Sequence, residues 1–187
     1  MLIAIEGIDG AGKTSLAKFL EKELQKLGFD VVIFKEPTKS ELGKKIMESS
    51  NLSPEEELEL FILDRKYDVE NNIRPALEQG KVVIMDRYYY STMAYQGALG
   101  LDINEIRRKN EEIAPEPGLV IFLDLDPEKA IKRVSKRGRQ DRFEDPDYLK
   151  KVREIFLSLN DKMVVLDAEE NPQILGKKAL KLILEQL

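Results

Sequence analysis

The sequence predicts an α/β fold of three layers, in which a five-stranded parallel sheet carries helices on both faces. Apolar runs rich in β-branched residues recur five times, at residues 2–5, 31–34, 82–85, 119–123 and 163–166. Helical patterns separate these runs, and strands that alternate with helices form βαβ units with a parallel sheet. The 187 residues contain neither an internal repeat nor a low-complexity linker, so residues 1–187 are expected to form a single domain.

Capping residues mark where the predicted helices begin. The first helix follows the first strand and ends at Gly28; its apolar positions are Leu16, Phe19, Leu20, Leu24 and Leu27. Ser53-Pro54-Glu55-Glu56 combines an N-cap, an early proline and a capping box, which predicts a helix over residues 54–78. An N-cap followed by proline recurs at three further helix starts, Asp126-Pro127, Asp145-Pro146 and Asn171-Pro172.

Composition excludes several kinds of chemistry. The chain has no cysteine and no histidine, which excludes disulfides, zinc held by thiolates or imidazoles, and acid–base catalysis by histidine. A net charge of −5 argues against nucleic acid as a partner, and no apolar run reaches the roughly 18 residues that would predict a membrane span. The N-terminus lacks the features of a signal peptide, so the expected location is cytoplasmic. Charged residues make up 35% of the chain, which favours a thermophile over a highly charged mesophile as its source.

Residues 7–14 read Gly-Ile-Asp-Gly-Ala-Gly-Lys-Thr and match the phosphate-binding pattern G-x-x-x-x-G-K-[ST], between a strand and a helix. Glycines let successive backbone N–H groups face a phosphate, Lys13 can reach the β- and γ-phosphates, and the Thr14 hydroxyl can bind Mg²⁺. The sequence therefore predicts a site for a nucleoside triphosphate, with Mg²⁺ as cofactor. The residues expected to bind the triphosphate are Gly7, Gly10, Ala11, Gly12, Lys13, Thr14 and Ser15.

Asp86 and Arg87 follow the third strand, at the edge of the sheet where ligands bind in parallel α/β folds. The Asp86 carboxylate can hold the water shell of Mg²⁺ beside Thr14. Arg87 can bind a phosphate through two parallel hydrogen bonds. The structural alternative is an aspartate N-cap that pairs with its neighbouring arginine.

A short polar segment rich in arginine follows the helix predicted over residues 127–136. Arg137, Arg139 and Arg142 lie in this segment, which covers about residues 136–145. As a lid over the phosphates, such arginines would stabilise the charge that develops on a transferred phosphoryl group. The alternative is a solvated basic loop.

Phe61 and Arg65 share a face of the predicted helix 54–78, because they are spaced i,i+4. A ring and a guanidinium in this arrangement can stack on a base and hydrogen-bond its edge. The alternative is a core phenylalanine beside a surface arginine.

Three segments occur in a specific order: Ile5-Glu6-Gly7-Ile8-Asp9-Gly10-Ala11-Gly12-Lys13-Thr14, then Asp86-Arg87-Tyr88 with Ser91 and Ala94-Tyr95-Gln96, then residues 137–142. Together they resemble the thymidylate kinase family over essentially the whole chain. The resemblance implies a P-loop NTPase fold of the nucleoside monophosphate kinase type. It implies transfer of a phosphoryl group from ATP to dTMP, which gives dTDP and ADP in dTTP biosynthesis. It also implies a homodimer that packs through helices of the central region.

The same resemblance assigns roles to single residues around dTMP. Asp9 meets the deoxyribose 3′-hydroxyl, and Arg87 holds the phosphate. Phe61 stacks on thymine, while Arg65 hydrogen-bonds its exocyclic oxygen. In the same resemblance, the position of Thr92 contacts the base, and Tyr95 crowds the 2′ position and disfavours ribonucleotides. The remaining expected substrate-binding residues are Glu36, Pro37, Ser91 and Gln96.

Members of the family differ in where the catalytic arginine lies. Some carry it in the phosphate loop, at the position that this chain fills with Gly10, and others carry it in the lid. This chain is similar to the lid-arginine type, and its expected catalytic residues are Lys13, Arg87, Arg137, Arg139 and Arg142. One departure is Lys35-Glu36-Pro37-Thr38-Lys39, where many bacterial members read Arg-Glu-Pro-Gly-Gly-Thr; Lys35 or Lys39 is then left to contact the acceptor phosphate.

Two other functions remain open on the sequence. The attacking phosphate oxygen of dTMP has a second pKa of about 6 and needs no general base, in agreement with a chain without histidine. In a deoxynucleoside kinase the attacking group is a neutral hydroxyl of the nucleoside, which needs a general base. Glu36 is the candidate for that base. A regulatory NTPase that recruits a partner would leave Phe61, Arg65 and Tyr95 without a role.

Overall fold

The predicted α/β fold is confirmed by a computed structural model, which describes residues 1–49, 51–135, 145–159 and 163–187. Its strands are β1 (Leu2–Glu6), β2 (Val31–Lys35), β3 (Val82–Asp86), β4 (Leu119–Asp124) and β5 (Met163–Asp167). They form one five-stranded sheet in the order β2-β3-β1-β4-β5, and every neighbouring pair is parallel. The three central strands supply most of the buried sheet, while β5 at one edge is only partly buried.

Each strand runs one residue further than its apolar run predicts. The additional residues are all charged: Glu6, Lys35, Asp86, Asp124 and Asp167. Because parallel strands end at the same edge of the sheet, these side chains gather where ligands bind in folds of this kind. Each apolar run thus ends one residue before the carboxyl edge of the sheet, where the charged side chains lie.

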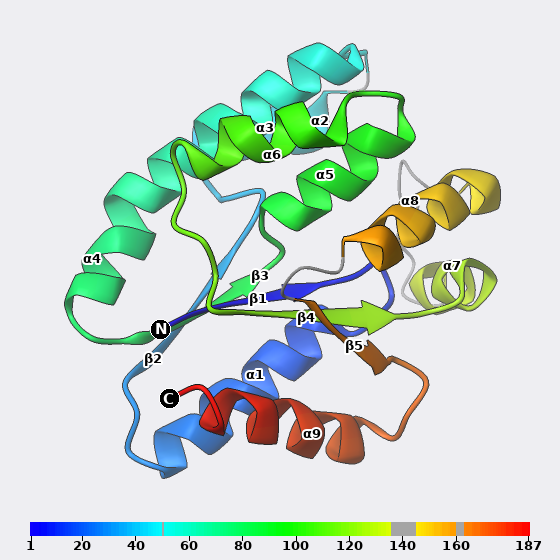
Figure 1. The fold of residues 1–187 in the computed structure, drawn as a ribbon. Helices are drawn as coiled ribbons and strands as arrows, with labels where there is room; N and C mark the ends of the chain where they lie inside the picture. The colour runs from blue at the N-terminus through cyan, green and yellow to red at the C-terminus, as the bar shows by residue number, and fades with distance from the viewer. Residues whose placement is uncertain (50, 136–144, 160–162) are drawn as a thin grey trace.

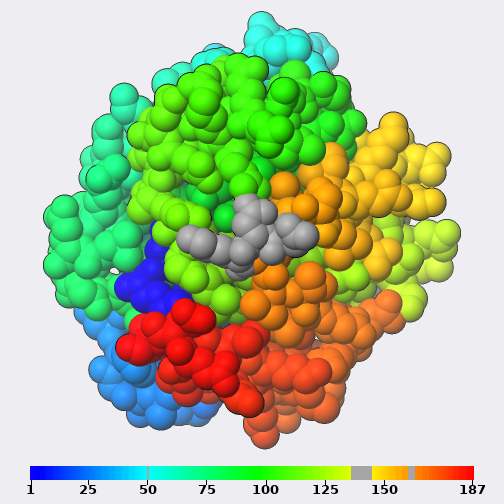
Figure 2. Space-filling view, in the orientation of Figure 1, coloured from blue at the N-terminus to red at the C-terminus, as the bar shows by residue number. Residues whose placement is uncertain are grey.

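The helices form the two outer layers (Figure 1). They are α1 (Lys13–Lys26), α2 (Glu41–Glu48), α3 (Pro54–Asp68), α4 (Arg74–Glu78), α5 (Tyr89–Ala98), α6 (Ile103–Glu111), α7 (Pro127–Ser135), α8 (Pro146–Ser158) and α9 (Pro172–Leu184). Helices α1 and α9 cover one face of the sheet, and α3, α5, α6 and α8 cover the other. Figure 2 shows the C-terminal segment, in red, beside blue residues from the N-terminal part of the chain, and α9 packs against α1.

The predicted helix starts are confirmed by their caps. Ser53 and Glu56 form the complete capping box at the start of α3. Asp145 and Asn171 each accept a hydrogen bond from a backbone N–H in the first turn of α8 and α9. The helix predicted over residues 54–78 is continuous, but a π-helical stretch at Val69–Ile73 divides it into α3 and α4.

A single hydrophobic core lies between the sheet and its helices, and it includes the tyrosines Tyr88, Tyr89 and Tyr90 that follow β3. Among the helices that the structure describes, none combines the length and the apolar character that crossing a bilayer requires.

Candidate active site

The phosphate loop joins β1 to α1 and turns through glycines. Gly7, Gly10 and Gly12 have φ values of 147°, 86° and 100°, which residues with a side chain rarely adopt. Lys13 is buried, and its Nζ atom donates hydrogen bonds of 2.9 Å to the carbonyls of Gly7 and Ile8. Burial lowers the pKa of Lys13 to about 8. The lysine therefore lies against the carbonyls of its own loop.

Helix α7 lies directly against this loop at Gly10. A Cβ atom on Gly10 would lie 2.8 Å from the carbonyl oxygen of Ala130, well inside contact distance. Three residues further along α7, Arg133 Nη1 donates a hydrogen bond of 3.3 Å to the Gly10 carbonyl. Both Nη atoms of Arg133 also donate to the carbonyl of Ala168, at 3.2 Å. The helix that leads to the predicted lid is thus fixed to the phosphate loop.

Thr14 and Asp86 come together, as a magnesium site requires. The Thr14 hydroxyl donates a hydrogen bond to Asp86 Oδ2. Asp86 is buried, and its Oδ1 atom has no hydrogen-bond partner within the described part of the chain. The described ranges contain no group of three or more His, Cys, Asp or Glu side chains that could hold an ion. An ion at this site would therefore take most of its ligands from phosphate and water, as Mg²⁺ prefers.

Arg87 donates hydrogen bonds to three residues that are predicted to bind dTMP. Its Nη2 atom donates to Asp9 Oδ1 at 2.7 Å and to the Tyr95 hydroxyl at 3.3 Å. Its Nη1 atom donates to the Ser91 hydroxyl at 3.0 Å, and the Tyr95 ring centroid lies 5.1 Å from the guanidinium. Burial alone would lower the pKa of Arg87, but Asp9 and Tyr95 raise it above its ordinary value. Arg87 is therefore a fixed cation beside the phosphate loop.

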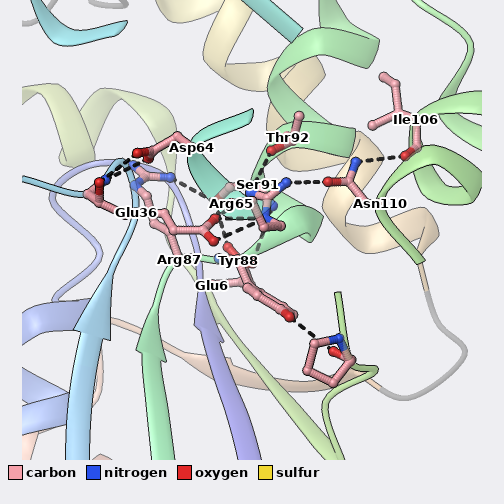
Figure 3. Close-up of polar contacts among 12 residues, drawn as sticks. Glu6, Glu36, Asp64, Arg65, Arg87, Tyr88, Ser91, Thr92, Ile106 and Asn110 are labelled. Atoms are coloured by element: carbon pink, nitrogen blue, oxygen red, sulfur yellow. Dashed lines mark hydrogen bonds and ion pairs between the residues drawn. The ribbon is translucent and has the colours of Figure 1, made fainter. Parts of the chain in front are cut away.

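Glu6 is a component of this site that the sequence analysis missed. It ends β1 with its side chain fully buried. Its Oε1 atom accepts hydrogen bonds from the backbone N–H groups of Tyr88 and Ser91, at 2.8 Å and 3.3 Å. Its Oε2 atom accepts the Ser91 hydroxyl at 2.5 Å. The carboxylate thus holds the start of α5 and the hydroxyl that receives Arg87 (Figure 3).

Burial raises the pKa of Glu6 to about 7. A carboxylate between an apolar strand and the phosphate loop is the sequence signal that could have identified it, because such a side chain is buried at the ligand edge.

Arg65 lies inside the protein, so the alternative of a surface arginine is wrong. Its exposed fraction is 1%, whereas Phe61, one turn earlier on α3, is only partly buried. The Nε and Nη2 atoms form a two-pronged ion pair with Glu36. Nη2 also donates to the Thr92 hydroxyl at 3.1 Å, and Nη1 donates to Asn110 Oδ1 (Figure 3). Burial alone would lower the pKa of Arg65, but the Glu36 carboxylate raises it.

The segment after β2, where the sequence departs from many bacterial members, is held by Asp64 of α3. Asp64 Oδ2 accepts the Thr38 N–H at 2.8 Å, and Oδ1 accepts the hydroxyls of Thr38 and Ser40 at 2.6 Å and 2.8 Å. Glu36 precedes this clamp and is joined to Pro37 by a cis peptide bond. Because Glu36 is engaged by an arginine, it is poorly suited to act as a general base.

The remaining predicted residues lie at various distances from this centre. Lys35 is exposed, and its Nζ atom lies 3.4 Å from Asp86 Oδ2. Gln96 is buried on α5 and donates from Nε2 to Glu57 Oε2 at 2.8 Å. Ser15 is exposed on the first turn of α1. The lid residues Arg137, Arg139 and Arg142 fall outside the described residues.

The fold and this constellation define a phosphate-loop kinase. The sheet order and the loop between β1 and α1 fit a donor site for a nucleoside triphosphate. The buried Arg65 and the partly buried Arg87 fit a second, cationic site beside it.

Comparison with known proteins identifies the family. The family model described as thymidylate kinase matches residues 5–179. The chain is 51% identical over 185 residues to a probable thymidylate kinase of Archaeoglobus fulgidus, covering 98% of this chain and 94% of the relative. It is 42% identical over 189 residues to the thymidylate kinase of Brachyspira hyodysenteriae, covering 98% and 93%. The thymidylate kinase of Xylella fastidiosa is 41% identical over 192 residues, covering 100% and 92%.

The chain therefore belongs to the thymidylate kinase family. Its activity is the ATP-dependent phosphorylation of dTMP to dTDP, as the resemblance implied. The deoxynucleoside kinase and the regulatory NTPase are set aside.

Proposed function

We propose that dTMP binds along α5, with its phosphate at Arg87 and its base at Arg65. The observation that carries this proposal is the adjacency of Ser91 and Thr92. The Ser91 hydroxyl accepts a hydrogen bond from Arg87, and the hydroxyl of the next residue accepts one from Arg65. Two guanidiniums from distant parts of the chain are thereby held at one turn of α5. One can neutralise a phosphate, and the other can donate to a carbonyl of the base.

The sugar lies between these two arginines in this proposal. Asp9 contacts Arg87 and keeps a partly exposed carboxylate that can accept the 3′-hydroxyl. Tyr95 is fixed from two sides, because its ring packs on Arg87 and its backbone carbonyl accepts the Tyr148 hydroxyl at 2.9 Å. A rigid ring at this place excludes a 2′-hydroxyl by its volume. Phe61 supplies the stacking face for thymine, while Glu36, Pro37 and Gln96 shape the pocket around the base.

The chemistry requires alignment and charge more than proton transfer. The attacking oxygen belongs to a phosphate that is largely ionised at neutral pH, so no base is needed. Lys13 exchanges the loop carbonyls for the β- and γ-phosphates of ATP, and Arg87 holds the acceptor phosphate in line. Thr14 and Asp86 would hold Mg²⁺, and their hydroxyl, carboxylate and unpartnered Oδ1 atom suit its water shell. When bound, that ion neutralises charge on the β- and γ-phosphates.

The catalytic arginine is supplied by the lid, in this proposal, because position 10 has no room for one. A side chain on Gly10 would collide with the backbone of Ala130 and would also need a positive φ. We expect Arg139→Ala or Arg142→Ala to lower kcat by orders of magnitude with little change in KM. Single-turnover kinetics measure this effect. Near-wild-type kcat in both variants would exclude the lid assignment.

The proposed homodimer packs through α2 and α3. Leu63 and Tyr67 lie one turn apart on α3 and are each 48% exposed, and Met47 on the adjoining α2 is 72% exposed. Large apolar side chains gathered on one surface mark an association site. Leu63→Asp should shift the sedimentation coefficient to that of a monomer. Leu184→Asp, on the exposed side of α9, is the matched control and should leave the assembly intact.

The reaction itself is tested by ADP release from ATP and Mg²⁺ with a panel of nucleoside monophosphates. We expect dTMP to give the highest kcat/KM, and thymidine to give no turnover. Arg87→Met should raise KM for every monophosphate, because phosphate contacts are shared, whereas Arg65→Met should impair selection between bases. Equal losses for all bases in the Arg65 variant would contradict the proposed orientation of dTMP.

A further inference from the structure

We infer that Asn110 is a positioning residue for base recognition, acting through Arg65. The inference rests on the proposed role of Arg65 as the reader of the base. Asn110 lies in the last turn of α6, is 0% exposed and belongs to none of the motifs in the sequence. Within the described residues, it makes the one hydrogen bond between α6 and the Arg65 side chain.

The orientation of the Asn110 amide is determined by its two hydrogen bonds. Nδ2 donates to the Ile106 carbonyl at 2.7 Å, one turn back along α6. Oδ1 is therefore the atom that faces Arg65, and it accepts a hydrogen bond from Nη1. A flipped amide would set its NH₂ group against the guanidinium and would lose both bonds, so one orientation is strongly favoured.

The bonds around Arg65 leave one N–H group available. Glu36 and Thr92 engage the Nε hydrogen and the two Nη2 hydrogens. Asn110 engages one Nη1 hydrogen. Within the described residues, no acceptor faces the second Nη1 hydrogen. Since a guanidinium is planar and rigid, fixing its other hydrogens also fixes the direction of this one.

A single fixed donor selects a base by its exocyclic group. The keto oxygen of thymine or uracil can accept the remaining Nη1 hydrogen. The amino group of cytosine is itself a donor and would leave the buried N–H unpaired, which is unfavourable. Glu36 holds only one edge of the guanidinium, so without Asn110 the opposite edge loses its support. Asn110 thus sharpens the preference for a keto pyrimidine while it touches no part of the substrate.

Asn110→Leu, which keeps the branched shape of the side chain but removes the acceptor, tests the inference. We expect KM for dTMP to rise about tenfold and the ratio of kcat/KM for dTMP over dCMP to fall by a similar factor. KM for ATP should stay unchanged, which a general loss of structure would not allow. Asn110→Asp retains an acceptor toward Arg65 and should restore most of the selectivity. Asn104→Leu, at an exposed position of the same helix, is the matched control and should behave as wild type.

Two outcomes separate this inference from the proposed function on which it rests. If Arg65→Met leaves the dTMP/dCMP ratio unchanged, the proposed role of Arg65 fails. If Arg65→Met lowers the ratio and Asn110→Leu does not, only the inference on Asn110 fails. If Asn110→Leu does not fold, Asn110→Ser replaces it as the test variant, because serine is too short to reach Nη1. A wild-type ratio in a folded Asn110→Ser protein overturns the inference.

Discussion

The phosphate loop and the arginine cluster around α5 are built by different means. Eight consecutive residues form the loop, and its shape comes from glycine backbone at positive φ. The arginine cluster, defined here as Arg65 and Arg87 with Glu36 and Asn110, draws its side chains from four separate parts of the chain. Residues that are neighbours in the sequence determine the backbone geometry of the loop. The side-chain network of the cluster forms only when the fold brings distant residues together. Substitutions in the loop should therefore reduce activity by removing its charge or changing its shape. Substitutions in the cluster should weaken binding by removing one hydrogen bond among several.

The largest effect should come from the loop. Lys13→Ala removes the cation that reaches the transferred phosphate, and we expect kcat to fall by about a thousandfold or more. Steady-state ADP release at saturating ATP and dTMP measures the loss. Lys26→Ala, an exposed lysine at the end of α1, serves as the control. Turnover within tenfold of wild type would remove Lys13 from the catalytic residues.

A smaller loss is expected at the cluster. Arg87→Met leaves Asp9 and the Ser91 hydroxyl without their shared cation, and we expect kcat/KM for dTMP to fall about a hundredfold. KM for ATP should change far less. Isothermal titration with each nucleotide separates the two sites. Equal weakening of ATP and dTMP would show that the loop and the cluster are one unit.

Binding of ATP should take up a proton at alkaline pH. The pKa of Lys13 is about 8 in the nucleotide-free protein because burial lowers it. Triphosphate anions favour the charged amine and raise that pKa, so affinity should decrease up to about tenfold per pH unit above 8. Calorimetry at pH 9 in two buffers of different ionisation enthalpy measures the proton uptake. Lys13→Arg, which stays protonated, should show none, and an equal uptake in both proteins would refute the assignment.

The last predicted effect concerns stability rather than activity, at the buried base of the cluster. The pKa of Glu6 is raised from 4.5 to about 7 by burial, so the folded state binds this proton more tightly than the unfolded state does. Protonated Glu6 therefore adds up to about 3 kcal/mol to the free energy of unfolding. This stabilisation is fully present below pH 4.5 and is lost as the pH rises through 7. Urea unfolding of wild type and Glu6→Gln across this range should show the free-energy difference changing with pH. Glu55→Gln, on the surface of α3, should show no such change.

The sequence allowed most of the fold to be predicted and about half of the site. Strand runs and helix caps depend on local residues, so all five strands and the marked helix starts are confirmed. The approach of Thr14 to Asp86 was also predicted, because Thr14 lies in a local motif and Asp86 ends a strand. Glu6 and Asn110 were missed, because their roles arise only from contacts with residues more than 40 positions away. The burial of Arg65 was missed because its ion-pair partner Glu36 comes from another element, 29 positions away.

The contact between Gly10 and Ala130 also limits how this enzyme can evolve. In the fold as it stands, an arginine at position 10 and α7 in its present place exclude each other. If the catalytic cation lies in the lid, as we propose, a single substitution that moved it to position 10 would first have to displace α7. A protein with an arginine at position 10 and α7 still in place would therefore be a deleterious intermediate between the loop-arginine and the lid-arginine arrangements. Exchange between them requires a prior shift of α7, so descent should preserve the location of the catalytic arginine more strictly than its surroundings.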